Sequence, residues 1–137
     1  MKLSEFLTVY SFAFLSFRRS NSTPTIDELR ENYSKYFFII PKIYCNDGFK
    51  VSIQVHNGAY CSSENGYREF GLDWREVEWG YPSEPLTDEK YNPEDEAGTS
   101  VGGYVPIEIM EELIEQHGGI DLKTTLEKYL KLLYYME

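Results

Sequence analysis

The chain has 137 residues, 16% of them aromatic, and a formal net charge of −10 at pH 7. That length is typical of one domain with its own core, and the aromatic content excludes a disordered chain. The negative charge disfavours binding to nucleic acid or to an anionic membrane and favours basic protein surfaces.

Apolar residues near the N-terminus recur at helical spacing and predict an amphipathic helix with the inner face Leu3, Phe6, Leu7, Tyr10, Ala13, Phe14 and Phe17. The stretch from Phe6 to Phe17 is about a dozen residues, which is too short to cross a membrane. No small-residue cleavage site follows it, so we expect neither a membrane anchor nor a signal peptide. Thr25 and Glu28 have the spacing of a capping box, which predicts a second helix over about Thr25–Lys35.

A β-hairpin is predicted over Phe37–Val55. Aromatic and β-branched residues fill its first strand, and apolar residues alternate with polar ones in its second, at Phe49, Val51, Ile53 and Val55. A three-residue turn at Asn46-Asp47-Gly48, with Gly48 left-handed, would pair Cys45 with Phe49, Ile43 with Val51 and Ile39 with Val55. A two-residue turn would instead pair Tyr44 with Val51. We favour the first register because it sets apolar residues opposite each other.

The next strand is predicted over Arg75–Tyr81, with Val77, Trp79 and Tyr81 on one face and Glu76, Glu78 and Gly80 on the other. Pro82 and Pro85 end it. The polar segment Ser83–Ser100 follows. It is long for a loop in a compact domain, which indicates that it is either functional or mobile.

The C-terminal part is predicted to hold a short strand at Val101–Val105 and two helices. Pro106 would be the first residue of the earlier helix, which has the inner face Ile107, Met110, Leu113 and Ile114 and the acidic outer face Glu108, Glu111, Glu112 and Glu115. Gly118-Gly119 ends this helix. Asp121 caps the last helix, whose apolar stripe is Leu122, Leu126, Tyr129, Leu130, Leu133 and Met136.

These elements predict a single α+β domain over residues 1–137, with a small antiparallel sheet built on a central hairpin and packed with helices. The predicted parts are a helical N-terminal extension (1–36), a sheet region (37–105) and C-terminal helices (106–136).

The negative charge is concentrated in one segment. Glu64–His117 holds fifteen acidic and three basic residues, whereas the rest of the chain is close to neutral. Such a block is either a solvated face or a docking surface for a basic partner. Trp74, Trp79 and Tyr81 lie within it, and aromatic residues among carboxylates are typical of binding hot spots.

Other chemistry is weakly supported by the residue spacing. Cys45, His56, Cys61 and His117 are zinc-ligand types, but they lack C-x₂-C or H-x₃-H spacing, and no nucleophile motif accompanies them. Glu76 and Glu78 would lie roughly 7 Å apart, as in a glycosidase pair, but an exposed strand face gives the same pattern. The acids between Asp88 and Glu96 lack the register of a calcium loop. We expect no catalytic residue, metal or cofactor, and two reduced thiols.

Several runs resemble a known group of proteins. They are Tyr44-Cys45-Asn46-Asp47-Gly48-Phe49, Glu76-Val77-Glu78-Trp79-Gly80-Tyr81-Pro82-Ser83-Glu84, Gly103-Tyr104-Val105-Pro106-Ile107-Glu108 and His117-Gly118-Gly119-Ile120. The region from Pro41 to Ile120 is similar to small acidic proteins of bacteriophages and prophages.

The resemblance implies a role against host defence, as in anti-CRISPR and anti-restriction proteins, in the cytoplasm of the bacterial host. The leading hypothesis is a non-enzymatic inhibitor that binds a basic nuclease, such as a Cas effector, without contacting nucleic acid or membrane directly. The expected partner-binding residues are Glu76, Glu78, Trp79, Glu84, Asp88, Glu89, Glu94, Asp95, Glu96, Glu108, Glu111, Glu112 and Glu115. The alternative is a phage structural or assembly protein that uses its aromatic N-terminal helix as the interface.

Overall fold

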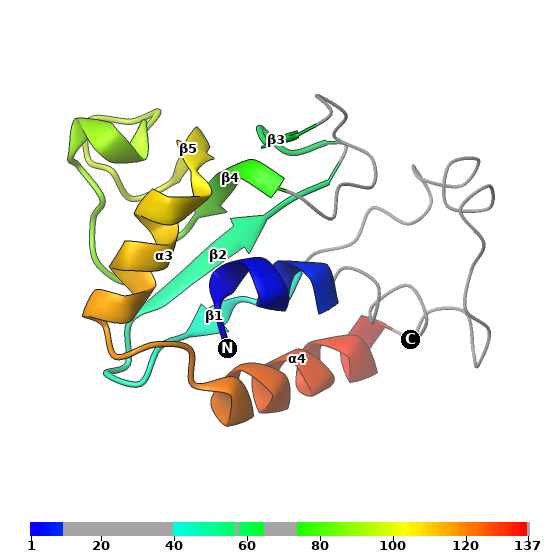
Figure 1. The fold of residues 1–137 in the computed structure, drawn as a ribbon. Helices are drawn as coiled ribbons and strands as arrows, with labels where there is room; N and C mark the ends of the chain where they lie inside the picture. The colour runs from blue at the N-terminus through cyan, green and yellow to red at the C-terminus, as the bar shows by residue number, and fades with distance from the viewer. Residues whose placement is uncertain (10–39, 57, 65–73, 137) are drawn as a thin grey trace.

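A small antiparallel sheet with helices packed on it forms the fold, which confirms the α+β prediction (Figure 1). The computed structural model describes residues 1–9, 40–56, 58–64 and 74–136. The predicted helix over Thr25–Lys35, the later part of the first helix and the pairing of Ile39 with Val55 lie outside these residues.

The longest strand, β4 (Trp74–Gly80), is the centre of the sheet. One edge of β4 pairs with β2 (Lys50–Gln54) and, further along, with the two-residue strand β3 (Ser62–Ser63). The other edge pairs with β5 (Val101–Pro106), and β1 (Ile43–Tyr44) extends the sheet beyond β2. The prediction did not include β3, because two serines carry no apolar alternation.

The helices pack against this sheet (Figure 1). Residues 3–9 are helical, and α3 (Ile107–Gln116) packs against β4 and β5. The last helix, α4 (Leu122–Met136), packs along β1. Its start is capped as predicted, because Asp121 Oδ1 accepts the Thr124 N–H at 3.1 Å.

The core lies between the sheet and the helices. It combines the inner residues of β2 and β4 with α3 and the N-terminal helical segment, and its fully buried members include Phe6, Ile53, Val77, Trp79 and Met110. Burying such side chains contributes about 1.5–3 kcal/mol each to folding. The alternation in Phe49–Val55 therefore identified a true core face.

The hairpin has the favoured register. Ile43 pairs with Val51, the Cys45 N–H donates to the Phe49 carbonyl at 2.8 Å, and Gly48 has a φ of +96°. A residue with a Cβ rarely adopts that backbone conformation, so the three-residue turn depends on this glycine.

Two details differ from the prediction. Pro106 ends β5 with a ψ of 134°, and α3 begins one residue later, at Ile107. Tyr81 does not continue the inner face of β4: its φ is +48°, and its side chain is 68% exposed. The left-handed residue turns the chain out of the sheet, and the Tyr81 N–H donates to the Ser100 carbonyl at 2.7 Å.

Candidate functional site

Residues 83–100, here called the acidic loop, are tied to the sheet by a buried tryptophan. Trp79 Nε1 donates to the Tyr91 carbonyl at 2.7 Å. Gly102 lies directly against the indole, since a Cβ there would be 2.4 Å from Nε1. Leu86 is buried, and its N–H donates to the Gly98 carbonyl at 2.7 Å. The loop is therefore held to the sheet by Trp79 and closed on itself by a backbone hydrogen bond.

Trp79 was expected to contact a partner, and this expectation is wrong. Its side chain is 0% exposed, so it positions the acidic loop from beneath and cannot reach another protein in this fold. The sequence pattern placed Trp79 correctly on the inner face of β4. The pattern could not show that the acidic loop packs on the indole and covers it.

Short local bonds shape the acidic loop around the 3-10 turn η1 (Glu89–Tyr91). Asp88 Oδ1 accepts the Lys90 N–H at 3.1 Å and caps this turn. Asp95 accepts the N–H groups of Thr99 and Ser100. These hydrogen bonds, with the Thr99 N–H foremost, lower the pKa of the Asp95 carboxyl below its usual value. Asp88 and Asp95 thus hold the loop's shape as well as carrying charge.

The outer face of α3 carries the next group of carboxylates. Glu108, Glu112 and Glu115 are exposed, and helical geometry spaces them about 4.5–6 Å apart along the axis. The helix packs against η1, so two acidic runs that are separate in sequence lie together (Figure 1). This juxtaposition is the main feature that the structure adds to the charge pattern.

Glu111 lies on the same helix, but its carboxylate binds the N-terminal helical segment (residues 3–9). Both of its carboxylate oxygens lie 2.9 Å from the Leu3 N–H, which donates to them. The carboxylate therefore caps the N-terminal helical segment, where unpaired N–H groups and the helix dipole favour a negative group. Glu111 is half-buried and belongs to the packing between two helices.

Glu76 and Glu78 lie on the outer face of β4, beneath the chain that leads into β3. Glu76 Oε1 accepts the Ser62 hydroxyl at 2.7 Å, and Glu78 Oε2 accepts the Tyr60 N–H at 2.7 Å. Both side chains are half-buried. The expected acids that are exposed are Glu84, Asp88, Glu89, Glu94, Glu96, Glu108, Glu112 and Glu115.

The cysteines and histidines occupy separate environments. Cys45 and Cys61 are buried free thiols. Burial, helped by the charge of Asp47, raises the pKa of Cys45 to about 11. Burial also lowers the pKa of His56 to about 4, and the Cys61 thiol donates to the His56 carbonyl at 3.3 Å. Across the described ranges, no three His, Cys, Asp or Glu side chains gather as metal ligands would.

His117 locks the hairpin turn to the end of α3. Its ring stacks on Phe49 with centroids 4.0 Å apart, and Nδ1 lies 2.6 Å from Asp47 Oδ2. The Asn46 side chain donates to the Gly118 carbonyl at 2.6 Å. A bond from the Phe49 N–H and the contact with His117 lower the pKa of the Asp47 carboxyl. No local sequence pattern predicts this role of His117, because Asp47 and His117 are 70 residues apart.

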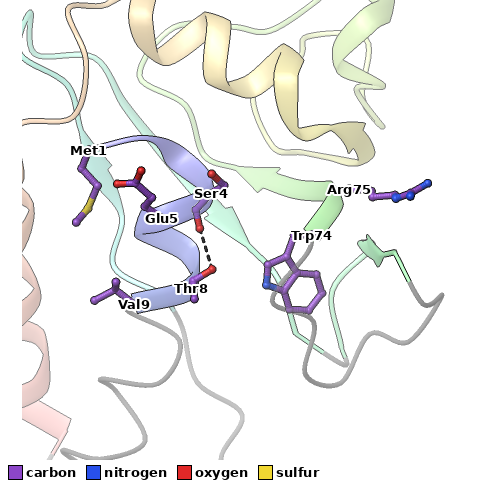
Figure 2. Close-up of a pocket in the computed structure, with 7 residues that line it drawn as sticks. All are labelled: Met1, Ser4, Glu5, Thr8, Val9, Trp74 and Arg75. Carbon is purple, nitrogen blue, oxygen red and sulfur yellow. Dashed lines mark hydrogen bonds between the residues drawn. The ribbon is translucent and has the colours of Figure 1, made fainter.

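A surface pocket of about 560 Å³ lies between the N-terminal helical segment and the start of β4 (Figure 2). Its lining is mixed, and consists of Met1, Ser4, Glu5, Thr8, Val9, Trp74 and Arg75. Arg75 is paired with Glu64 at 3.2 Å. The pocket holds none of the expected partner-binding residues, and it lies apart from the acidic loop.

The fold and surface therefore define the class: a small α+β protein in whose described part many of the exposed acids lie on one loop and one helix. Comparison with models of protein families, with curated proteins and with solved structures finds no match. Within the part of the chain that the structure describes, no helix has the length and apolar character needed to cross a bilayer.

Proposed function

We propose that the protein is a non-enzymatic inhibitor that binds the basic, nucleic-acid-binding surface of a bacterial defence nuclease. The observation that carries this proposal is the contact of α3 with η1, which places the helix that carries Glu108, Glu112 and Glu115 beside the acidic loop. Carboxylates held on a packed scaffold can take the place of phosphates in a groove lined with lysine and arginine. The resemblance to small acidic phage proteins points in the same direction.

The packing of the scaffold supports this proposal. The inner face of α3 is buried through Met110, Leu113 and Ile114, and Trp79 fixes the acidic loop from below. A surface that is already ordered loses little conformational entropy when it binds, which favours affinity. Concentrated charge also steers encounters, and this effect falls as salt screens charges beyond about 8 Å at physiological ionic strength.

The alternative is a structural protein that docks through its aromatic N-terminal helix, and the structure describes only residues 3–9 of that helix. Leu3, Phe6 and Leu7 are 0% exposed, so the described part of that inner face is already used in the core. Phe6→Asp would place a charge in the core, so loss of binding in that variant would not identify an interface.

The test is a plating assay combined with DNA cleavage. Bacteria that carry a CRISPR–Cas or restriction system, taken one at a time from a panel, express the protein and are infected with a phage that the system targets. We expect plating to be restored for at least one system, and the purified protein to block DNA cleavage by that nuclease with an effect that weakens as salt rises. Failure against every member of the panel would overturn the proposal.

Charge-reversal variants identify the surface. The variant Glu108→Lys, Glu112→Lys, Glu115→Lys should lose inhibition and stay folded, because exposed helix positions tolerate substitution. The matched comparison sets the double variant Glu112→Lys, Glu115→Lys against Glu5→Lys, Glu127→Lys, which makes the same charge change at exposed acids outside this surface. Equal loss in both double variants would mean that only net charge matters.

A further inference from the structure

Two exposed tyrosines meet above the outer face of the sheet. Tyr60, from the chain before β3, and Tyr104, from β5, have ring centroids 5.8 Å apart with planes tilted by 37°. Their side chains are 47% and 38% exposed. The backbones are also joined, because the Tyr104 N–H donates to the Tyr60 carbonyl at 2.8 Å.

A β-bulge directs Tyr104 into this pair. Val77 pairs with Val105 and Trp79 with Gly102, so Gly103 and Tyr104 together face the single residue between Val77 and Trp79. Bulges occur where a strand must re-aim a side chain, often beside functional sites. The φ of Tyr104 is +52°, a left-handed conformation that bulky residues rarely adopt and that persists only when its surroundings impose it.

Neighbouring residues impose the left-handed conformation of Tyr104. The Asn92 amide donates to the carbonyls of Gly103 and Tyr104 at 3.1 and 3.2 Å, and so fixes the bulge from the end of η1. Gly103 leaves the room that Tyr60 needs, since a Cβ there would be 2.5 Å from the Tyr60 Cβ. Three elements thus hold two aromatic rings at the surface, next to the acidic loop.

Two half-buried carboxylates of β4 bind the chain segment that carries Tyr60. Glu78 faces the bulge and binds the Tyr60 N–H through Oε2, and Glu76 binds the Ser62 hydroxyl through Oε1. Among the described residues, the second oxygen of each carboxylate takes part in no hydrogen bond or ion pair. Aromatic faces next to half-buried carboxylates attract a planar cation, which can stack on a ring and form hydrogen bonds with an oxygen at the same time.

We propose that Tyr60, Tyr104, Glu76 and Glu78 form a recognition site for an arginine side chain of the partner protein. The site deepens the proposed function and rests on it, since it names the residue type that the basic partner presents. Arginine fits better than lysine because its guanidinium is flat, stacks on aromatic rings and offers several donors, whereas the ammonium of lysine is a compact, strongly hydrated charge.

The test compares two synthetic peptides of equal charge, one alternating arginine with glycine and the other lysine with glycine, titrated into the full chain at low salt. We expect the arginine peptide to bind about two- to fivefold more tightly, as one exposed cation–π contact provides. Its saturation should shift the ring resonances of Tyr60 and Tyr104. Equal affinity for both peptides, or unshifted ring resonances, would overturn the proposal.

Two substitutions test whether the preference for the arginine peptide depends on the ring pair. Tyr104→Gly removes the ring and retains a residue suited to a positive φ, so it should stay folded and bind both peptides equally. Tyr81→Gly is the control, because Tyr81 is also exposed and left-handed but is not part of the ring pair. An arginine preference that survives in Tyr104→Gly refutes the site.

The charge-reversed α3 variant separates this inference from the proposed function. It should weaken both peptides alike and leave the arginine preference unchanged. An arginine preference without inhibition of any nuclease rejects the proposed function alone, whereas inhibition without the preference rejects only the arginine site.

Discussion

Acid should destabilise this protein through His56 at a pH well above the usual carboxylate range. The His56 side chain is buried, and its Nδ1 accepts the Gly58 N–H at 3.1 Å. A second proton on the ring would place a charge out of water and break this bond. Burial accordingly lowers the pKa of His56 to about 4.

The direction and the size of this loss of stability follow from the difference in pKa between the folded and unfolded chains. The unfolded chain takes up a proton at its ordinary histidine pKa of about 6.5, whereas the folded chain does so only near 4. The stability that neutral His56 contributes is therefore complete above about pH 6.5 and is lost as the pH falls toward 4. The loss should reach about 2 kcal/mol by about pH 5 and roughly 3 kcal/mol in full.

The assay is urea unfolding at several pH values, for the natural chain and for His56→Asn. Asparagine can still accept the N–H two residues later and does not titrate, so the variant should hold its stability across this window. The pKa values of Asp47, Asp95 and Asp121 are lowered by hydrogen bonds, so their contributions are present above about pH 4 and are lost below it. A parallel fall in both proteins would refute the role of His56.

Three further substitutions test the packing of the acidic surface. Trp79→Phe should lower the free energy of unfolding by about 1–3 kcal/mol and speed amide exchange in the acidic loop, since it removes the hydrogen bond that ties this loop down. Glu111→Gln should cost about 0.5–2 kcal/mol through the weakened cap on the Leu3 N–H, whereas exposed Glu112→Gln should cost less in the same urea assay. Gly98→Ala should lower the melting temperature, because Gly98 has a φ of +60° and its new Cβ would lie 2.6 Å from a backbone oxygen; an unchanged melting temperature would contradict the geometry.

Local sequence patterns were sufficient for the hairpin and for α3. The alternation through Ile53 identified the core face, and the pairing of apolar residues across the turn selected one register from two. Apolar residues at helical spacing correctly gave the inner face of α3. Each of these features depends on residues only a few positions apart, which is the range over which strand and helix periodicity carry information.

Contacts between distant residues could not be predicted in this way. Glu111 has the same helical pattern as its acidic neighbours, but it alone faces the start of the chain, 108 residues away. The six-residue sequence of β5 does not predict the bulge at Tyr104. The bulge depends on the hydrogen bond from Asn92 and on the space beside Gly103. The predicted partner-binding set therefore mixed surface charges with acids that the fold itself uses.

The structure separates these two groups of acids. Glu76, Glu78, Asp88, Asp95 and Glu111 accept hydrogen bonds, mostly from backbone N–H groups, so removing one leaves a donor unpaired and weakens the fold. Glu108, Glu112 and Glu115 repel one another on an exposed face, and among the described residues their carboxylates take part in no hydrogen bond or ion pair. Loss of inhibition after substitution in the first group would therefore report on folding and binding together. Only the second group isolates charge, which is why the reversal on α3, read against its matched control, is the decisive test of an acidic docking surface.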